Sequence, residues 1–190
     1  MTPIQLFWLI LGVSWAVIEL LIALKTRVPV SSSNQHQYRS ERLIWAVVAA
    51  ALLAALWLKH LHLAALPIAA FNRQLLAVVL FTLGLALRCY AVLSLGRFFS
   101  TTVVTRDQHA LIDTGPYHWI RHPAYTGLLC GFFAAGLAMG DALALLMLVC
   151  PVIYVLGQRI RIEEQWLIEH FGEVYYDYCR RTKKLIPWLY

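Results

Sequence analysis

Five long apolar runs take up most of this chain and restrict what it can fold into. They cover residues 6–24, 43–58, 75–95, 125–139 and 142–156. A helix needs roughly 17–25 apolar residues to cross the hydrocarbon core of a bilayer, and each run is close to that length. Hydrophobic residues make up 61% of the sequence and charged residues only 14%, which excludes an ordinary soluble domain. We therefore predict an all-α integral membrane protein with about five transmembrane helices in a single domain, residues 1–190.

The flank of the first run and the turn between the last two runs each predict a structural feature. The first run lacks the basic flank and the cleavage site of a signal peptide, so we expect a retained helix. The last two runs are separated only by Gly140 and Asp141, which predicts a helical hairpin. The first arm of this hairpin carries several glycines, and small residues allow helix backbones to approach closely.

Lysine and arginine are distributed unevenly, which predicts the orientation in the membrane. If the amino-terminus is outside, 14 of the 16 basic residues lie on the cytoplasmic side and only Lys59 and Arg73 lie outside. Cytoplasmic loops are enriched in these residues. The long connection 96–124 and the tail 171–190 are then both cytoplasmic. The net charge of +6 follows from this topology, and we expect no nucleic-acid partner.

The four cysteines are isolated from one another, with no C-x-x-C pair and no histidine at the spacing of a zinc ligand. We expect structural thiols and no metal site.

Two polar clusters at the boundaries of the apolar runs contain the candidate functional residues. Residues 115–125 combine two prolines, two histidines, an arginine and three aromatic residues. Such a segment is costly at a membrane boundary unless it binds something. Residues 159–164 place two arginines and two glutamates where the last run ends. Both clusters lie on the predicted cytoplasmic face, so we expect one active site there.

The tail has aromatic residues at helical spacing. Phe171, Val174, Tyr175 and Tyr178 recur at intervals of three and four. This pattern predicts a C-terminal amphipathic helix, which either lies in the membrane interface or covers the site.

From residue 96 to residue 187 the chain resembles the isoprenylcysteine carboxyl methyltransferase family, in the form of its short prokaryotic members, which share features with phospholipid methyltransferases. The matching motifs are, in order, His109-Ala110-Leu111-Ile112, Gly115-Pro116-Tyr117, Arg121-His122-Pro123-x-Tyr125, Arg159-x-x-x-Glu163-Glu164, Leu167-Ile168 and Phe171-Gly172-x-x-Tyr175-x-x-Tyr178. The ordered combination is much more specific than any one motif. The first two helices carry no such motif. We therefore expect three N-terminal helices in residues 1–95 and a catalytic region in residues 96–190.

The resemblance implies that S-adenosylmethionine binds in the cytoplasmic connection between the third and fourth spans. The implied cofactor-binding residues are His109, Ala110, Leu111, Ile112, Tyr117, His122, Pro123, Ala124, Tyr125 and Glu163. Arg159 matches the arginine that the family uses for the substrate, so Arg159 and Glu163 are the implied catalytic residues. The family usually has a longer acidic run after this arginine. Here Arg161 and Ile162 occupy part of that run, which leaves Glu164 as an alternative to Glu163.

The chemistry of these residues is compatible with methyl transfer. Arg159 and Glu163 are four residues apart, so they share one face if the fifth helix continues into the cytoplasm. They could instead form an ordinary surface ion pair. Methyl transfer from a sulfonium needs aligned reactants and the exclusion of water. A carboxylate acceptor is already ionised at neutral pH and needs no general base, and Arg159 could hold it through a bidentate contact.

Several other polar residues have alternative interpretations. Arg121 is expected either to buttress its loop or to contact the cofactor, and His118 beside Trp119 to lie at the interface. Arg88, inside the third run, either snorkels, which the nearby membrane edge favours, or faces the bundle interior. Glu19 in the first run is similarly ambiguous.

The resemblance implies a methyltransferase that O-methylates a lipid-linked carboxylate on a lipophilic or prenylated acceptor, and the chemistry of these residues is compatible with it. The same scaffold could instead O-methylate a phenolic lipid or N-methylate a phospholipid. An Arg-His-x-x-Tyr segment also resembles the nicotinamide-binding end of membrane sterol reductases, but those enzymes are longer and have more spans. A non-catalytic scaffold is disfavoured because Arg159, Glu163 and the whole connection are present. The expected location is the plasma membrane of a prokaryote or the endoplasmic reticulum of a eukaryote, with the site facing the cytoplasm.

Overall fold

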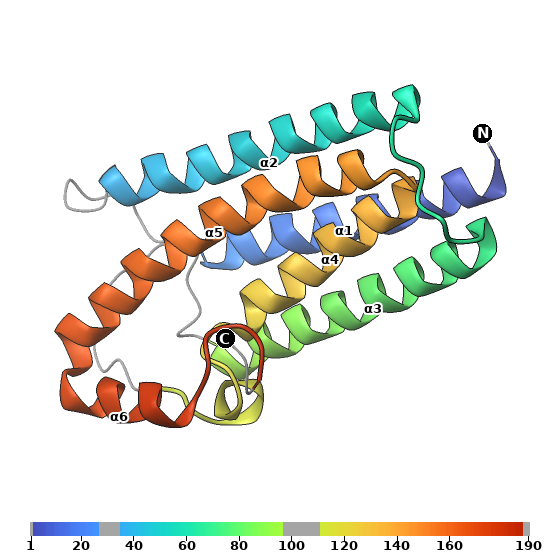
Figure 1. Cartoon of the computed structure of the whole chain (residues 1–190). Helices are drawn as coiled ribbons and strands as arrows, with labels where there is room; N and C mark the ends of the chain where they lie inside the picture. Colours follow the sequence, from blue (N-terminus) through green and yellow to red (C-terminus); the bar gives the residue numbers. More distant parts are fainter. Residues whose placement is uncertain (1, 27–34, 97–110, 188–190) are drawn as a thin grey trace.

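The computed structural model describes residues 2–26, 35–96 and 111–187, and these residues form a helical bundle (Figure 1). Its long helices are α1 (Pro3–Thr26), α2 (Gln35–Leu61), α3 (Ala70–Leu95), α4 (Pro123–Met139) and α5 (Ala142–Phe171). A short 3-10 helix, η3 (Gly115–His118), and the helix α6 (Glu173–Arg181) lie together at one end of the bundle. The predicted all-α fold is confirmed.

The five long helices fall on the five predicted apolar runs. Within the described ranges, four of them are long and apolar enough to cross a membrane, and α4, at 17 residues, is a shorter apolar helix. The last apolar run, residues 142–156, is only the first part of α5, which has 30 residues. Its length is about 45 Å, against about 30 Å of bilayer hydrocarbon. It therefore has a continuous extension beyond the apolar run.

The helices α3 and α4 approach each other closely, at glycines. A Cβ atom added to Gly127 would lie 2.5 Å from the carbonyl oxygen of Gly84, and one added to Gly84 would lie 2.8 Å from that of Gly127. One turn further along α4, Gly131 leaves room for the indole ring of Trp15 in α1. The predicted role of small residues in this helix is confirmed, since larger side chains would separate the helices.

The predicted hairpin between α4 and α5 is confirmed. Gly140 adopts a left-handed conformation with φ of 80°, and the carboxylate of Asp141 caps α5 by accepting a hydrogen bond from the Ala144 amide at 3.0 Å. The same carboxylate accepts a hydrogen bond from the Ala64 amide at 2.8 Å. These backbone donors hold the pKa of Asp141 below its ordinary value. The turn is thus attached to the loop between α2 and α3.

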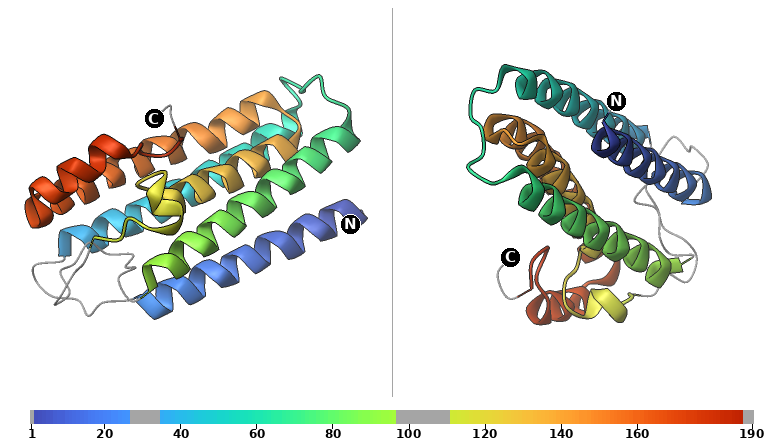
Figure 2. Two further views of the ribbon diagram at one scale, coloured as in Figure 1. Left: turned by 90° about the horizontal axis from the view of Figure 1, so that it is seen from below. Right: turned by 90° about the vertical axis from the view of Figure 1, so that its right-hand side faces the viewer.

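At the opposite end of the bundle, the connection and the tail are bound to each other (Figures 1 and 2). The Arg121 amide donates to the Lys183 carbonyl at 2.7 Å, and the His122 amide donates to the Lys184 carbonyl at 3.0 Å. The backbone just before α4 is therefore fixed by a segment about sixty residues later in the chain.

Candidate functional site

A cavity of about 100 Å³ lies where α3, the connection, α5 and α6 meet. Its walls are apolar and aromatic side chains around one arginine, one histidine and one glutamate. The lining residues are Leu95, Leu111, Ile112, Tyr117, Arg121, His122, Glu163, Leu167, Phe171, Tyr175 and Tyr178. Five of them belong to the predicted cofactor-binding set: Leu111, Ile112, Tyr117, His122 and Glu163.

Glu163 links this cavity to two further predicted residues. The Tyr125 hydroxyl, in the first turn of α4, donates a hydrogen bond to the Glu163 carboxylate at 2.9 Å. The same hydroxyl interacts with the Arg159 side chain, and Arg159 is only 5% exposed. Because α5 is continuous through both residues, Arg159 and Glu163 lie one turn apart on one face, as predicted. The interpretation of Arg159 as part of a surface ion pair was wrong, because its side chain is buried.

Glu164 faces different surroundings. Its carboxylate accepts a hydrogen bond from Arg121 Nε at 2.8 Å, lies 2.9 Å from Lys184 Nζ and 3.4 Å from His122 Nε2. It does not line the cavity. Three groups from the connection and the tail therefore converge on this one carboxylate, which joins α5 to both segments.

Arg121 buttresses its loop, which was one of its two predicted roles. Its Nη1 atom donates to the carbonyl oxygens of Thr182 at 2.5 Å and Cys179 at 3.2 Å, while its Nε atom bonds Glu164. These contacts buttress the loop against the tail. The side chain also borders the cavity.

The tail helix α6 covers the cavity, which is one of its two predicted positions. Tyr175 and Tyr178 are 1% and 3% exposed and line the cavity, whereas Val174 is exposed. The Tyr178 hydroxyl donates to the Tyr117 carbonyl at 2.7 Å. The Tyr175 hydroxyl is buried and has no hydrogen-bond partner among the described residues.

The tyrosines of this cavity are held in their neutral form. Burial raises the pKa of Tyr117, and the negative charge of Glu163 raises it further. Burial also raises the pKa of Tyr175 and Tyr178. All three phenols therefore remain hydrogen-bond donors at physiological pH.

Three predicted cofactor-binding residues within the described structure, Pro123, Ala124 and Tyr125, do not line the cavity. His109 and Ala110 lie outside the described residues. Pro123 is the buried first residue of α4, and Ala124 packs against Ala91 of α3 and Tyr117. Pro123 and Ala124 position the start of α4.

Arg88 and Glu19 form an ion pair inside the bundle, so the snorkelling interpretation of Arg88 was wrong. Arg88 Nη2 donates to Glu19 Oε2 at 2.6 Å, and Arg88 Nε donates to the other carboxylate oxygen. Arg88 Nη1 also donates to the Ala124 carbonyl at 3.1 Å. The Trp15 indole nitrogen donates to Glu19 at 2.9 Å. Glu19, more than sixty residues away in sequence, supplies the counter-charge that keeps Arg88 in the interior.

Sequence reasoning did not assign Leu95, Leu167, Phe171, Tyr175 and Tyr178 to the site, although all five line the cavity. The aromatic spacing in the tail and the family motifs that contain Leu167 and Phe171 were the available signals. They predicted a helix but not the surface on which it lies.

Comparison with known proteins found similar sequences that belong to one family. The sequence model of the isoprenylcysteine carboxyl methyltransferase (ICMT) family matches residues 75–169, half of the chain. The protein-S-isoprenylcysteine O-methyltransferase of Saccharomyces cerevisiae is 33% identical over 116 residues, which cover 60% of this chain and 48% of the yeast protein. The enzyme of the same name from Rattus norvegicus is 33% identical over 114 residues, covering 56% of this chain and 38% of the rat protein. The chain spans about half the length of the curated relatives it matches.

A solved structure has a related fold. It is that of the eukaryotic intramembrane Ras methyltransferase ICMT, with a TM-score of 0.55 and 24% sequence identity. The likeness covers 84% of this chain and 55% of the other. At this identity the likeness concerns the fold, and it supports an integral membrane bundle.

Proposed function

Since this chain belongs to the isoprenylcysteine carboxyl methyltransferase family, we propose that it is a membrane enzyme that transfers a methyl group from S-adenosylmethionine to the carboxylate of a lipid-linked acceptor. The observation that carries this proposal is the Tyr125 hydroxyl, which contacts Glu163 at an aromatic cavity and also interacts with the buried Arg159. A carboxylate and a guanidinium are thus placed side by side at one end of the bundle.

The cavity of about 100 Å³ can hold part of S-adenosylmethionine, since sites for ligands of that size measure about 300–1,000 Å³, and its side chains suit the groups of this cofactor. Tyr117, His122, Phe171 and Tyr175 provide aromatic rings, which suit a nucleobase and a nearby positive charge. Glu163 provides a carboxylate for a charged amino group. The buried Tyr175 hydroxyl, which has no hydrogen-bond partner among the described residues, provides a further polar contact. When bound, the cofactor would supply an electrophilic methyl group on a sulfonium.

We propose that Arg159 binds the carboxylate of the acceptor. Its guanidinium can hold a carboxylate through two parallel hydrogen bonds. This contact would fix the direction in which the acceptor oxygen points, and alignment is the main requirement of the reaction. Because a carboxylate is ionised at neutral pH, no side chain has to remove a proton.

A carboxylate acceptor requires less of this site than a phenol or an amine would, because it is already ionised. A phenol or a protonated amine must lose a proton, which requires a base. Among the described residues that line the cavity, His122 is the one histidine, and its Nε2 atom faces the Glu164 carboxylate at 3.4 Å. His122 thus shares this carboxylate with Arg121 and Lys184.

The tail would exclude water from the reaction. Tyr175 and Tyr178 are buried against the cavity, so α6 covers it on the side away from the bundle. Exclusion of water strengthens the contacts of Glu163 and Arg159 with charged ligands. The distribution of basic residues supports a cytoplasmic location for this end of the molecule.

The test is methyl transfer by purified protein in lipid nanodiscs, with methyl-labelled S-adenosylmethionine and an N-acetylated, S-farnesylated cysteine. We expect label in a methyl ester, which alkali releases as methanol. The amide of the same acceptor should take up no label. Alkali-stable label in a phenolic lipid or a phospholipid would contradict the carboxylate assignment, and absence of transfer to every acceptor class would contradict the proposed activity.

A further inference from the structure

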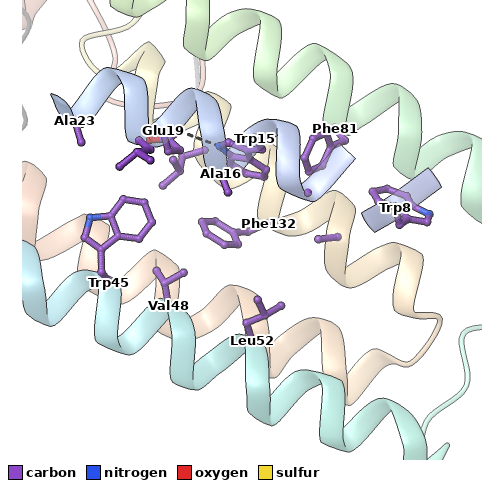
Figure 3. A pocket seen from close by; sticks show the side chains of 14 residues that line it. Trp8, Trp15, Ala16, Glu19, Ala23, Trp45, Val48, Leu52, Phe81 and Phe132 are labelled. Atoms are coloured by element: carbon purple, nitrogen blue, oxygen red, sulfur yellow. Dashed lines mark hydrogen bonds between the residues drawn. The ribbon is translucent and has the colours of Figure 1, made fainter. Parts of the chain in front are cut away.

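A second cavity, of about 540 Å³, lies between α1 and α2, with α4 behind it (Figure 3). In Figure 3, Trp45, Val48 and Leu52 of α2 face Trp15 and Ala16 of α1 across this space. None of its lining residues belongs to the cavity that contains Glu163. The proposed reaction therefore leaves this cavity without a role.

The wall of the cavity is apolar and electrically neutral. Glu19 is its one charged lining residue within the described structure, and the ion pair with Arg88 compensates this charge. The indole nitrogens of Trp15 and Trp8 donate to Glu19 at 2.9 Å and to Gln74 at 2.6 Å. These polar groups already have partners inside the protein, so the wall selects an apolar ligand that needs no hydrogen bonds.

The cavity opens sideways at the depth of the membrane. Leu20 and Trp45 at its rim are 56% and 46% exposed, whereas Val48 and Leu128 at its floor are 8% and 6% exposed. All four residues lie in apolar helices. The medium at this depth is lipid hydrocarbon, not water.

The dimensions of the cavity decide what can occupy it. On α1 it extends from Trp8 to Ala23, about 22 Å along the helix axis. The empty space of the cavity, about 1290 Å³ with its open side included, corresponds over this length to a mean cross-section of about 57 Å², whereas a helix of about 10 Å diameter requires about 80 Å². A helix from a second copy or from a partner protein is too wide. One extended hydrocarbon chain fits.

We propose that this cavity binds one acyl chain of a bilayer phospholipid and that the chain completes the packing of α1 on the bundle. A bilayer lipid is the occupant because the opening faces the bilayer, where phospholipids are in large excess. The residues that line this cavity include none of Tyr125, Arg159 and Glu163. The site is therefore separate from the one assigned to the methyl acceptor.

Two glycines offer a matched test. A Cβ atom added at Gly12, which lines the cavity, meets no atom within 4 Å, and the same is true of Gly157 in α5, outside the cavity. Gly12→Leu should fill the cavity without a clash, and Gly157→Leu is the control for the same change elsewhere. Leu52→Trp fills the cavity from the α2 side and provides a second variant.

Each protein is reconstituted in nanodiscs of palmitoyl-oleoyl phosphatidylethanolamine and phosphatidylglycerol, released, and analysed by native mass spectrometry. We expect the wild type and Gly157→Leu to retain one phospholipid, and Gly12→Leu and Leu52→Trp to retain at least about tenfold less, a difference of about 1.4 kcal/mol in binding. Equal retention by the wild type and both filling variants would overturn the proposal.

A competition experiment separates the two possible sources of a hydrocarbon chain. We expect a farnesylated cysteine, added at a concentration that saturates methyl transfer, to leave the phospholipid bound. Displacement would overturn the assignment to a bilayer lipid and would show that the cavity binds the farnesyl group of the acceptor. Lipid retention is measured without turnover, so an inactive protein that retains phospholipid would contradict the proposed function and leave this inference standing.

Discussion

At the scale of single residues, the two adjacent glutamates of α5 have different surroundings. Successive residues of a helix are rotated by about 100°. This rotation places Glu163 at the aromatic cavity and Glu164 among Arg121, His122 and Lys184. The sequence alone left the two as alternatives, because the family motif contains both. The packed structure places Glu163 at the cavity and Glu164 against the tail, which supports the proposed role of Glu163 in binding the cofactor.

Glu163→Gln should weaken the binding of S-adenosylhomocysteine. A charge-assisted hydrogen bond contributes about 1.5–3 kcal/mol, so the dissociation constant should rise about 10- to 150-fold. Isothermal titration calorimetry of the detergent-solubilised protein measures this change. Glu169→Gln, an exposed position on the same helix, is the control. Unchanged affinity in Glu163→Gln would remove this residue from the cofactor site.

Arg159→Ala should separate the acceptor from the cofactor. We expect turnover of a farnesylated cysteine to fall about a hundredfold or more, which corresponds to about 2.7 kcal/mol of lost transition-state stabilisation. Binding of S-adenosylhomocysteine should stay close to that of the wild type. Arg159→Lys should restore only part of the activity, because an ammonium group cannot make the planar two-pronged contact.

The control for Arg159 is Arg161→Ala, two residues later and exposed. A parallel loss of cofactor binding and turnover in Arg159→Ala would show that Arg159 belongs to the cofactor site or to the fold.

At the scale of the helices, α1 is attached to the bundle through a few large contacts. Trp15 packs against Phe81 of α3 with ring centroids 4.7 Å apart and against Phe132 of α4 at 5.5 Å. Glu19 binds Arg88, which also binds the Ala124 carbonyl at the start of α4. The buried ion pair therefore connects α1 to the segment that carries Tyr125.

Glu19→Ala should destabilise the protein, because it leaves the Arg88 charge buried without its partner. Breaking a buried ion pair costs about 3–5 kcal/mol, which lowers the melting temperature of a protein of this size by about 6–20 °C. Thermal unfolding in detergent, followed by tryptophan fluorescence, measures the shift. Glu169→Ala should melt as the wild type does.

The double variant Glu19→Leu/Arg88→Leu should recover part of the loss, since it removes both charges together. A melting temperature of Glu19→Ala equal to that of the wild type would mean that the pair contributes nothing to stability.

At the scale of the whole molecule, both ends of the bundle agree with one orientation. Lys59 lies near the end of α2 and Arg73 near the start of α3, at the end where the hairpin turn lies. Arg121, Arg180, Arg181 and the two lysines of the tail lie at the other end, with the candidate site. The excess of basic residues at the end that carries the site supports a cytoplasmic position for it.

Cysteine labelling should place residue 108 and residue 190 in the cytoplasm and residue 1 outside. In a background without the four native cysteines, Gln108→Cys should react with a membrane-impermeant maleimide only after the cell is opened. A cysteine added before Met1 should react in intact cells. Labelling of Gln108→Cys in intact cells would reverse the orientation and place the site on the outer face.

The sequence by itself determined the helices, the hairpin and the end of the bundle at which the site forms. These features depend on local properties: apolar runs long enough to cross a bilayer, a Gly140-Asp141 turn too short for anything but a hairpin, and polar clusters that begin where the runs end. Only the tertiary structure decided which groups meet. Arg88 contacts Glu19, Glu163 and Glu164 have different surroundings, and α6 covers the cavity. Each of these contacts joins residues that are 38 to 69 positions apart or depends on helix rotation. No local pattern encodes such a contact, since it forms only when several helices pack at once and every buried charge must find a partner.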